Sequence, residues 1–271
     1  MNPSNKLIDI INLSFSYGEN NFSLKDINLP IGNKDFISII GRNGSGKSTL
    51  VKIISRIYKG YRGTINYSGK DIREIENKEF SRQVSYLPQS GIQISEEMTV
   101  FELLLLARYP YKKFGDFIFS DKDKMIVEES IKFTQAEKFR NKYFHKLSGG
   151  EKQKILITLA LVQLDITSSL EEKVLIIDEP LTYLDVNYQL EIFSILNKLN
   201  KDNNLTIIII THDLNLALKY TSKTLLLEGG EIISFDETGK VITEEILKKH
   251  FLINSKIVKL EDEFHINYKT L

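Results

Sequence analysis

The chain has 271 residues, of which 42% are hydrophobic and 27% charged, so it can bury a sizeable core without disulfide or metal support. It contains no cysteine, which excludes a disulfide framework, a thiolate zinc site and a cysteine nucleophile. Lysine plus arginine and aspartate plus glutamate each number 36, and this balance argues against a nucleic-acid-binding protein and a polybasic membrane anchor.

The apolar segments are short. Residues 1–13 show no secretory signal, and the longest apolar runs, such as 103–107 and 207–210, fall far below the ~20 residues of a membrane span. We therefore expect a soluble chain that stays in the compartment where it is made and touches a membrane only peripherally.

Strands and helices are predicted to alternate along most of the chain. Near-continuous runs of β-branched residues and leucine are typical of strands buried on both faces of a parallel sheet. These runs occupy 36–40, 174–177 and 206–210. Helical patterns follow them, over about 47–57, 186–199 and 214–220. Such alternation predicts an α/β fold.

Other regions predict antiparallel structure. Residues 7–31 and 63–67 resemble antiparallel edge strands, and 225–235 predicts a hairpin that turns at Gly229 and Gly230.

Residues 91–147 have little strand character and are predicted to form a helical insert. Within it, Thr99 and Glu102 have the spacing of a capping box before an apolar helix. After Thr243 we expect a short helix and weak strands.

A glycine-rich loop directly follows the first apolar strand. It fits the phosphate-binding pattern G-x-x-x-x-G-K-[ST], and its residues are Gly41, Arg42, Asn43, Gly44, Ser45, Gly46, Lys47, Ser48 and Thr49. Glycines let the backbone turn several N–H groups toward a phosphate chain, and the next helix adds a positive dipole end. Lys47 would carry charge to the β- and γ-phosphates, and Ser48 would ligate Mg²⁺. The strand before the loop and the helix after it favour an ATP site over an ordinary turn.

Two carboxylates, Asp178 and Glu179, follow the apolar run that begins at Val174. This places them at the carboxyl edge of a sheet, where nucleotides bind. Asp178 would hold Mg²⁺ or its water, and Glu179 would polarise the attacking water. Asp-Glu-Pro could also simply end a strand in a polar turn, but the glycine-rich loop favours the catalytic interpretation.

A third motif indicates the family. Residues 147–151 spell LSGGE, which resembles the LSGGQ signature of ATP-binding cassette (ABC) ATPases, with glutamate in the last place. The rest of the family pattern follows in order along nearly the whole chain. Ser148 and Glu151 also have capping-box spacing, so we expect them to start a helix as well.

The resemblance implies a role for each matching residue. Tyr17 would stack on adenine, a contact worth roughly 1–3 kcal/mol. Gln89 would ligate Mg²⁺ and water, and His212 would contact the γ-phosphate, so that Glu179, His212, Gln89 and Lys47 form the catalytic set. The residues that would act in trans on the ATP of the other subunit are Ser148, Gly149, Gly150, Glu151 and Asp185.

The resemblance also implies the architecture. A P-loop NTPase (RecA-like) core would comprise about 1–90 and 151–242, with an antiparallel β subdomain, a helical subdomain over about 91–150 and an extension over about 243–271. One such chain cannot present a P-loop and a signature to the same nucleotide. The family therefore implies a homodimer that closes around two ATPs, bound to transmembrane permease subunits and served indirectly by a solute-binding protein, with no nucleic acid.

A further segment, Ala107-Arg108-Tyr109-Pro110, looks like the GRYP segment of ATPases that serve iron-siderophore, haem and cobalamin importers. Ala107 replaces the usual glycine, and residues 152–154 replace the usual arginine-rich run after the signature. The segment could also be a helix end stopped by proline. We expect an importer motor of this class at the cytoplasmic face of the membrane.

Two alternatives remain at the level of sequence. One is an ABC ATPase of a transporter for another substrate, and the other is a soluble ABC ATPase of iron–sulfur cluster assembly. The transported molecule would not touch this chain, so the sequence does not identify it.

Overall fold

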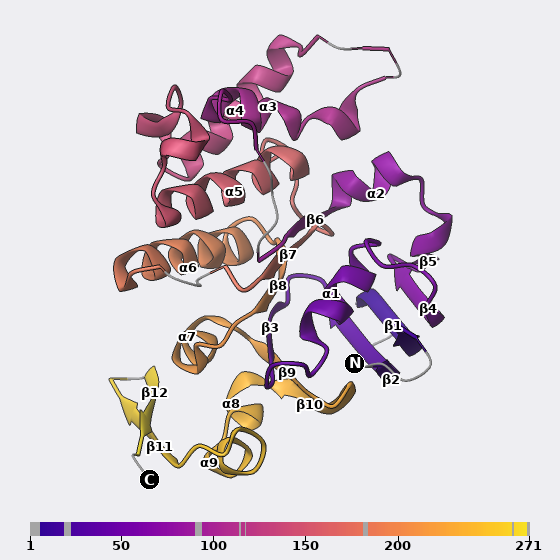
Figure 1. Cartoon of the computed structure of the whole chain (residues 1–271), viewed down its shortest axis with the longest axis vertical. Helices are drawn as coiled ribbons and strands as arrows, with labels where there is room; N and C mark the ends of the chain where they lie inside the picture. The colour runs from indigo at the N-terminus through magenta and orange to yellow at the C-terminus, as the bar shows by residue number, and fades with distance from the viewer. Residues whose placement is uncertain are drawn as a thin grey trace. The chain divides into compact units, whose positions relative to one another are not determined.

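The computed structural model describes residues 6–18, 23–89, 94–113, 115–116, 118–180, 184–261 and 263–269 (Figure 1). The chain divides into two compact units, one of Met1–Glu74 with Thr206–Leu271 and one of Ile75–Leu205. Within the described ranges, no helix is both long enough and apolar enough to cross a membrane.

The first unit contains the predicted antiparallel sheet. Its strands lie in the order β2 (Ser23–Gly32), β1 (Lys6–Ser16), β4 (Arg62–Tyr67) and β5 (Lys70–Asp71). β1 pairs antiparallel with both β2 and β4. Tyr17 directly follows β1, so this sheet sets the position of its ring.

Parallel strands form the second layer of this unit. β3 (Phe36–Ile40) pairs in parallel with β8 (Thr206–Ile210) and with β9 (Lys223–Glu228). Every residue of β3 and β8 is buried, which explains their uninterrupted apolar runs.

The predicted hairpin is also confirmed. β10 (Glu231–Glu237) pairs antiparallel with β9. Gly229 and Gly230 form its turn with φ of 57° and 85°, a left-handed conformation that favours glycine.

Helix α1 (Lys47–Ile54) begins where predicted but ends earlier than expected. Arg56 adopts a left-handed φ of 61°, and the N–H groups of Ile57 and Tyr58 both donate to the Lys52 carbonyl. Such bonds close a helix end, so the prediction of a helix to about residue 57 was wrong at this boundary.

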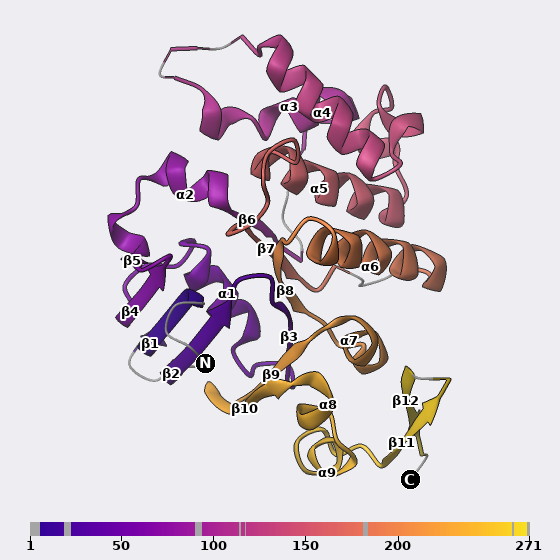
Figure 2. The same ribbon diagram turned by 180° about the vertical axis from the view of Figure 1, so that it is seen from behind.

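The C-terminal part packs against α7 (Leu214–Tyr220). Its elements are α8 (Thr238–Val241), α9 (Glu244–Ile246), a π-helical turn over Leu247–Phe251, β11 (Ser255–Leu260) and β12 (Glu263–Tyr268). Figures 1 and 2 both show the β11–β12 hairpin beside α7, and the N–H of Ile266 donates to Asn215 Oδ1 at 2.7 Å. The expected short helix and strands are therefore present.

The second unit combines a parallel strand pair with helices. β6 (Val84–Leu87) pairs with β7 (Val174–Asp178). The helices are α2 (Asn77–Gln83), α3 (Val100–Leu106), α4 (Asp121–Phe133), α5 (Gly149–Leu164) and α6 (Val186–Lys201). α3, α4 and α5 share a core that includes Leu104, Val127 and Ile155 (Figure 2). The helical character predicted for residues 91–147 is confirmed over the described residues, and 91–93, 114 and 117 lie outside them.

The Thr99–Glu102 capping box starts α3 as predicted. The Glu102 N–H donates to the Thr99 hydroxyl at 3.3 Å, and the Thr99 N–H donates to the Glu102 carboxylate at 2.9 Å.

Arg108 is a buried anchor rather than a surface helix end. Its side chain is 2% exposed and donates to Asp123 at 3.1 Å and to the Val162 carbonyl at 2.9 Å. Its guanidinium lies 3.6 Å from the centre of the Tyr111 ring. Lys112 also donates to Asp123, at 2.9 Å. The RYP segment thus links α4 and α5 within the helical subdomain.

The loop between α5 and β7, residues 165–173, packs against the end of α5. Asp165 ends α5 with a left-handed φ of 57° and accepts a hydrogen bond from Thr167 at 2.6 Å. Lys173 donates to the Ser168 hydroxyl at 2.7 Å and to the Leu164 carbonyl. Asp165 also lies 3.4 Å from Arg108, so the end of α5 belongs to the same buried network.

Asp123→Asn should destabilise the fold by about 3 kcal/mol, because it leaves two buried cations without their shared carboxylate. Burial alone would raise the pKa of Asp123, but hydrogen bonds from Ser120, Lys112 and Arg108 outweigh it and hold this pKa well below its ordinary value. The stabilisation is therefore complete above the ordinary pKa of about 3.9 and is lost as the pH falls below it.

Urea denaturation of the native protein and of the Asp123→Asn variant, at pH 7 and at lower pH, measures the difference in their free energies of unfolding. Asp121→Asn on the same helix is the matched control, because the Asp121 side chain is fully exposed, and it should change stability by less than about 0.5 kcal/mol. Equal stability of the two variants at pH 7 would remove the anchor role of Asp123.

Candidate functional site: a phosphate loop, an acidic strand end and a signature helix

The glycine-rich loop runs from β3 into α1 and needs glycine at defined positions. Gly41, Gly44 and Gly46 have φ of 148°, 79° and 107°. A Cβ on Gly41 would lie 2.2 Å from the Leu227 carbonyl oxygen, so any side chain there would push the loop off β9. Gly41 therefore lets the loop pass close against β9.

Lys47 lies across this loop. Its ammonium donates to the carbonyls of Gly41 at 2.9 Å and Arg42 at 3.2 Å, and the residue is buried. The Ser45 backbone joins the loop to the next hairpin, since its carbonyl accepts from the Gly230 N–H at 3.1 Å. The loop is therefore held by contacts near both of its ends.

Tyr17 belongs to an aromatic cluster beside the start of α1. Its hydroxyl is 3.0 Å from the Thr49 hydroxyl, and its ring meets Phe15 and Tyr58 edge to face. Partial burial raises the pKa of Tyr17, so the phenol stays protonated at neutral pH. About half of the side chain is exposed, which leaves ring surface for a base.

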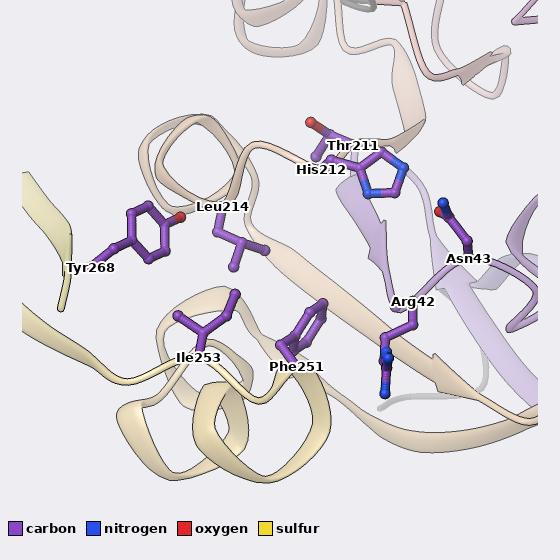
Figure 3. A pocket seen from close by; sticks show the side chains of 9 residues that line it. Arg42, Asn43, Thr211, His212, Leu214, Phe251, Ile253 and Tyr268 are labelled. Carbon is purple, nitrogen blue, oxygen red and sulfur yellow. The ribbon is translucent and has the colours of Figure 1, made fainter. Parts of the chain in front are cut away.

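His212 lies in the short connection between β8 and α7. The Asp213 carboxylate caps α7 by accepting from the Leu216 N–H at 2.9 Å, and the backbone N–H of Asp213 donates to the Thr211 hydroxyl at 3.1 Å. These bonds fix the turn that presents the imidazole. Figure 3 shows His212 near Arg42 and Asn43 at the rim of a hollow of about 430 Å³.

The second unit holds the predicted carboxylates at the end of β7. Asp178 is buried and accepts from the Tyr86 hydroxyl at 3.2 Å, a contact that the sequence did not reveal. Glu179 has a left-handed φ of 49°, unusual for a residue with a side chain. Gln89 donates to the Glu179 carboxylate at 2.6 Å. The acid pair and Gln89 thus meet at one strand end.

The signature residues start α5 with the predicted capping box. The Ser148 N–H donates to Glu151 at 2.8 Å, and the Glu151 N–H donates to the Ser148 hydroxyl at 3.4 Å. The first of these bonds lowers the pKa of Glu151, with a smaller contribution from the Ser148 hydroxyl, so the glutamate stays ionised.

The signature helix α5 and the segment of Leu184 and Asp185 before α6 lie against each other. A Cβ on Gly150 would lie 2.5 Å from the Tyr188 ring, and one on Gly149 would lie 3.7 Å from Leu184. Asp185 caps α6 by accepting from the Tyr188 N–H at 3.0 Å. Gly150 therefore lets the start of α6 approach α5 closely.

The described residues were searched for clusters of side chains that could bind a metal ion by themselves. No group of three or more histidine, aspartate or glutamate side chains within the described ranges could hold a metal ion. Ser48 in the first unit and Asp178 in the second could each offer one oxygen ligand to Mg²⁺, an ion that usually keeps phosphate and water ligands as well.

The predicted residues therefore gather in two groups. The first unit holds the phosphate loop, Tyr17 and His212. The second holds Gln89, the Asp178–Glu179 pair, the signature and Asp185.

Comparison with known proteins identifies the family. The model of the ABC transporter family matches residues 24–182. The chain is 33% identical to the iron(3+)-hydroxamate import ATP-binding protein FhuC of Bacillus subtilis, covering 91% of this chain and 88% of the relative. It is 32% identical to the petrobactin import ATP-binding protein FpuD of Bacillus anthracis, covering 93% and 89%.

A solved structure shares the fold. The dimeric structure of MJ0796, a bacterial ABC transporter cassette, superposes with a TM-score of 0.71 at 25% identity, covering 85% of this chain and 98% of the other. With the phosphate loop, the acidic strand end and the signature helix in place, this chain belongs to the ABC transporter family as an ATP-binding cassette with a P-loop α/β fold.

Proposed function

We propose that this cassette is the ATP-hydrolysing motor of an ABC importer for an iron chelate or a related chelate, such as an iron-siderophore, haem or cobalamin. The observation that carries the hydrolytic part is the Glu179 carboxylate, held at the end of β7 in contact with Gln89. A nucleotide-binding regulator without turnover would not need this carboxylate.

The triphosphate would lie along the backbone N–H groups of the glycine-rich loop, with adenine on Tyr17. Lys47 would exchange its loop carbonyls for β- and γ-phosphate oxygens, because a charged pair is stronger than a bond to a neutral acceptor. Ser48, Asp178 and Gln89 would hold the Mg²⁺ that arrives with ATP, and the metal would offset phosphate charge.

Glu179 would act as general base on the attacking water, and His212 would orient that water at the γ-phosphate. For this step Gln89 must release the carboxylate, since a lone pair that accepts an amide proton is less available to water. The Gln89–Glu179 bond therefore fits a resting state that nucleotide binding would open.

The signature of a second copy would complete the site. Its α5 N-terminus would present the Ser148 hydroxyl, the glycine N–H groups and a helix dipole to the γ-phosphate, and Asp185 would lie beside them. ATP would then hold two copies together, and hydrolysis would release them. The dimeric structure of the related cassette supports this arrangement.

The importer assignment is supported by the RYP segment and by the two relatives named for chelate import. These relatives carry different chelates, so the likeness supports a class of cargo rather than one molecule. A chelate importer would place this chain at the cytoplasmic face of the membrane, bound to permease subunits, with a solute-binding protein delivering cargo. An iron–sulfur assembly ATPase would instead bind soluble scaffolds.

Glu179→Gln should lower the turnover of ATP by roughly 10²–10⁴-fold, because it removes the base while keeping the shape of the side chain. ATP affinity should persist, and the ATP-bound dimer should live longer. Phosphate release and equilibrium nucleotide binding measure the two effects. Glu171→Gln, an exposed change in the loop before β7, is the control with normal turnover. Normal turnover in Glu179→Gln would remove the base role.

Lys47→Ala should weaken ATP binding by roughly 10–100-fold, since it removes a charged hydrogen-bond donor from the loop. Calorimetric titration with a non-hydrolysable ATP analogue tests this, beside the exposed control Lys59→Ala, which should keep its affinity. An unchanged affinity in Lys47→Ala would contradict the proposed phosphate site.

Affinity purification from membranes tests the importer assignment. A multi-span permease should co-purify with the tagged chain, and ATP hydrolysis by that complex should rise with cargo-loaded solute-binding protein. Recovery of only soluble scaffold proteins would favour the iron–sulfur alternative.

A further inference from the structure

The aromatic cluster around Tyr17 contains two rings that the proposed function does not use. The rings of Phe15 and Tyr58 lie 5.0 Å and 5.7 Å from the Tyr17 ring, centre to centre, and are nearly perpendicular to it, at 84° and 87°. Phe15 and Tyr58 are themselves stacked, with 5.8 Å between their centres and 3° between their planes. Two perpendicular contacts restrict the tilt of the Tyr17 ring more than either contact would alone.

Tyr58 follows α1, and the end of that helix sets its position. Its N–H donates to the Lys52 carbonyl at 3.2 Å, beside the bond from the Ile57 N–H at 2.8 Å. The Lys52 ammonium also lies 5.5 Å from the centre of the Tyr58 ring, a distance that allows a cation–π contact. Tyr58 is therefore held both by the backbone and by a side chain of α1.

The first turn of α1 contacts Tyr17 as well. Thr49 is buried, and its hydroxyl lies 3.0 Å from the Tyr17 hydroxyl. Behind it, Leu50, Val51 and Ile53 are buried, so α1 is packed firmly into the first unit. One helix, which begins at the phosphate loop, thus supports Tyr17 through its first turn and through the residue cluster at its end.

This support is relevant because Tyr17 is 49% exposed. An exposed aromatic side chain has several rotamers available unless neighbouring contacts select one of them. A base that is joined to a triphosphate can stack only on a ring of suitable tilt at a suitable distance from the phosphate loop. A ring that already has this orientation loses less conformational freedom when the nucleotide binds, and this raises the affinity.

We infer that Tyr58, stacked on Phe15, is a positioning residue for the nucleotide base, because it holds the Tyr17 ring at a fixed tilt relative to α1 and the phosphate loop. Tyr58 has this role only if Tyr17 is the adenine platform of the proposed function, on which the inference rests. Because Tyr58 acts through Tyr17, it should affect the binding of the base and not that of the phosphates.

Two ligands separate these effects. A non-hydrolysable ATP analogue carries the base and the phosphates, whereas inorganic tripolyphosphate carries phosphates alone. Tyr58→Leu should raise the dissociation constant of the ATP analogue by roughly three- to ten-fold, since part of the stacking is lost, and that of tripolyphosphate by less than about two-fold. Tyr58→Phe keeps the ring and should leave both constants within about two-fold of the native values. Calorimetric titration measures them, with Ile57→Ala, a half-exposed neighbour, as the matched control without effect.

Tyr17→Ala distinguishes the failure of this inference from the failure of the platform itself. It should weaken the ATP analogue by roughly 5- to 150-fold, the full value of a stacked base. If Tyr17→Ala does so while Tyr58→Leu changes neither ligand, Tyr17 is the platform and Tyr58 does not position it. If Tyr17→Ala leaves the ATP analogue unchanged, both ideas fail. If Tyr58→Leu weakens both ligands alike, Tyr58 supports the fold or the phosphate loop, and the inference is overturned.

Fluorescence tests the orientation of the ring without any nucleotide. The chain contains no tryptophan, so Tyr17→Trp introduces a single indole at the platform. Adding Tyr58→Leu should increase the amplitude of its nanosecond motion in the anisotropy decay by about two-fold or more, and adding Ile57→Ala should not. Equal decays in these two double variants would contradict the positioning role. Should circular dichroism show that Tyr58→Leu is unfolded, Phe15→Leu replaces it in both measurements, with the same expected results and the same contradicting ones.

Discussion

The nucleotide's negative charge is the constraint on which the rest of this structure depends. One lysine cannot offset a triphosphate, so backbone N–H groups must turn toward it, and they can do so only where glycine accepts a positive φ. Gly41, Gly44 and Gly46 meet this need. The loop has little room to relax, because Gly41 contacts Leu227 and Ser45 is bound to Gly230. The fully buried strands β3 and β8 are the rigid support that makes such a tight loop possible.

The backbone at Glu179, the residue proposed to act in hydrolysis, is held under strain. A non-glycine residue in the left-handed region costs of order 1–3 kcal/mol, and Glu179 occupies that region. The neighbouring contacts offset this cost, since Tyr86 binds Asp178 and Gln89 binds Glu179. The bond from Gln89 also ties the conformation of its loop to the state of the base. A movement of Gln89 would therefore change the hydrogen bonding of the Glu179 carboxylate.

Much of the fold could be predicted from local sequence. The apolar runs at 36–40 and 206–210 give strands with those bounds, and the Gly229–Gly230 turn and the Thr99 cap are set by neighbouring residues. The site motifs are likewise local, so their residues could be chosen from sequence, although their roles stay predictions. α2 and β6 are too short for a clear periodic signal, and the end of α1 depends on the conformation of Arg56.

Contacts between distant residues could not be predicted in this way. Arg108 binds Asp123 and Asp165, far apart in sequence, and a single chain gives no sign of that pairing. The same holds for the Tyr86–Asp178 bond and for the seating of Tyr188 over Gly150. Alternation along β6 places Tyr86 on one face of its strand, but only the parallel pairing with β7 sets it opposite Ile176, from where its hydroxyl reaches Asp178 two residues further on.

The signature combines a structural and a chemical task without conflict. Ser148 uses an oxygen lone pair to cap α5, and a hydroxyl that accepts still has its proton to donate. Glu151 serves as well as glutamine for the cap, because its carboxylate accepts the Ser148 N–H. The negative charge of Glu151 would repel a phosphate placed nearby. The hydrogen bond from the Ser148 N–H and the positive dipole end of α5 offset this repulsion. Because Gly150 lies under Tyr188, the signature and the start of α6 are packed as one body. Any displacement of the signature toward a nucleotide must therefore carry Asp185 with it.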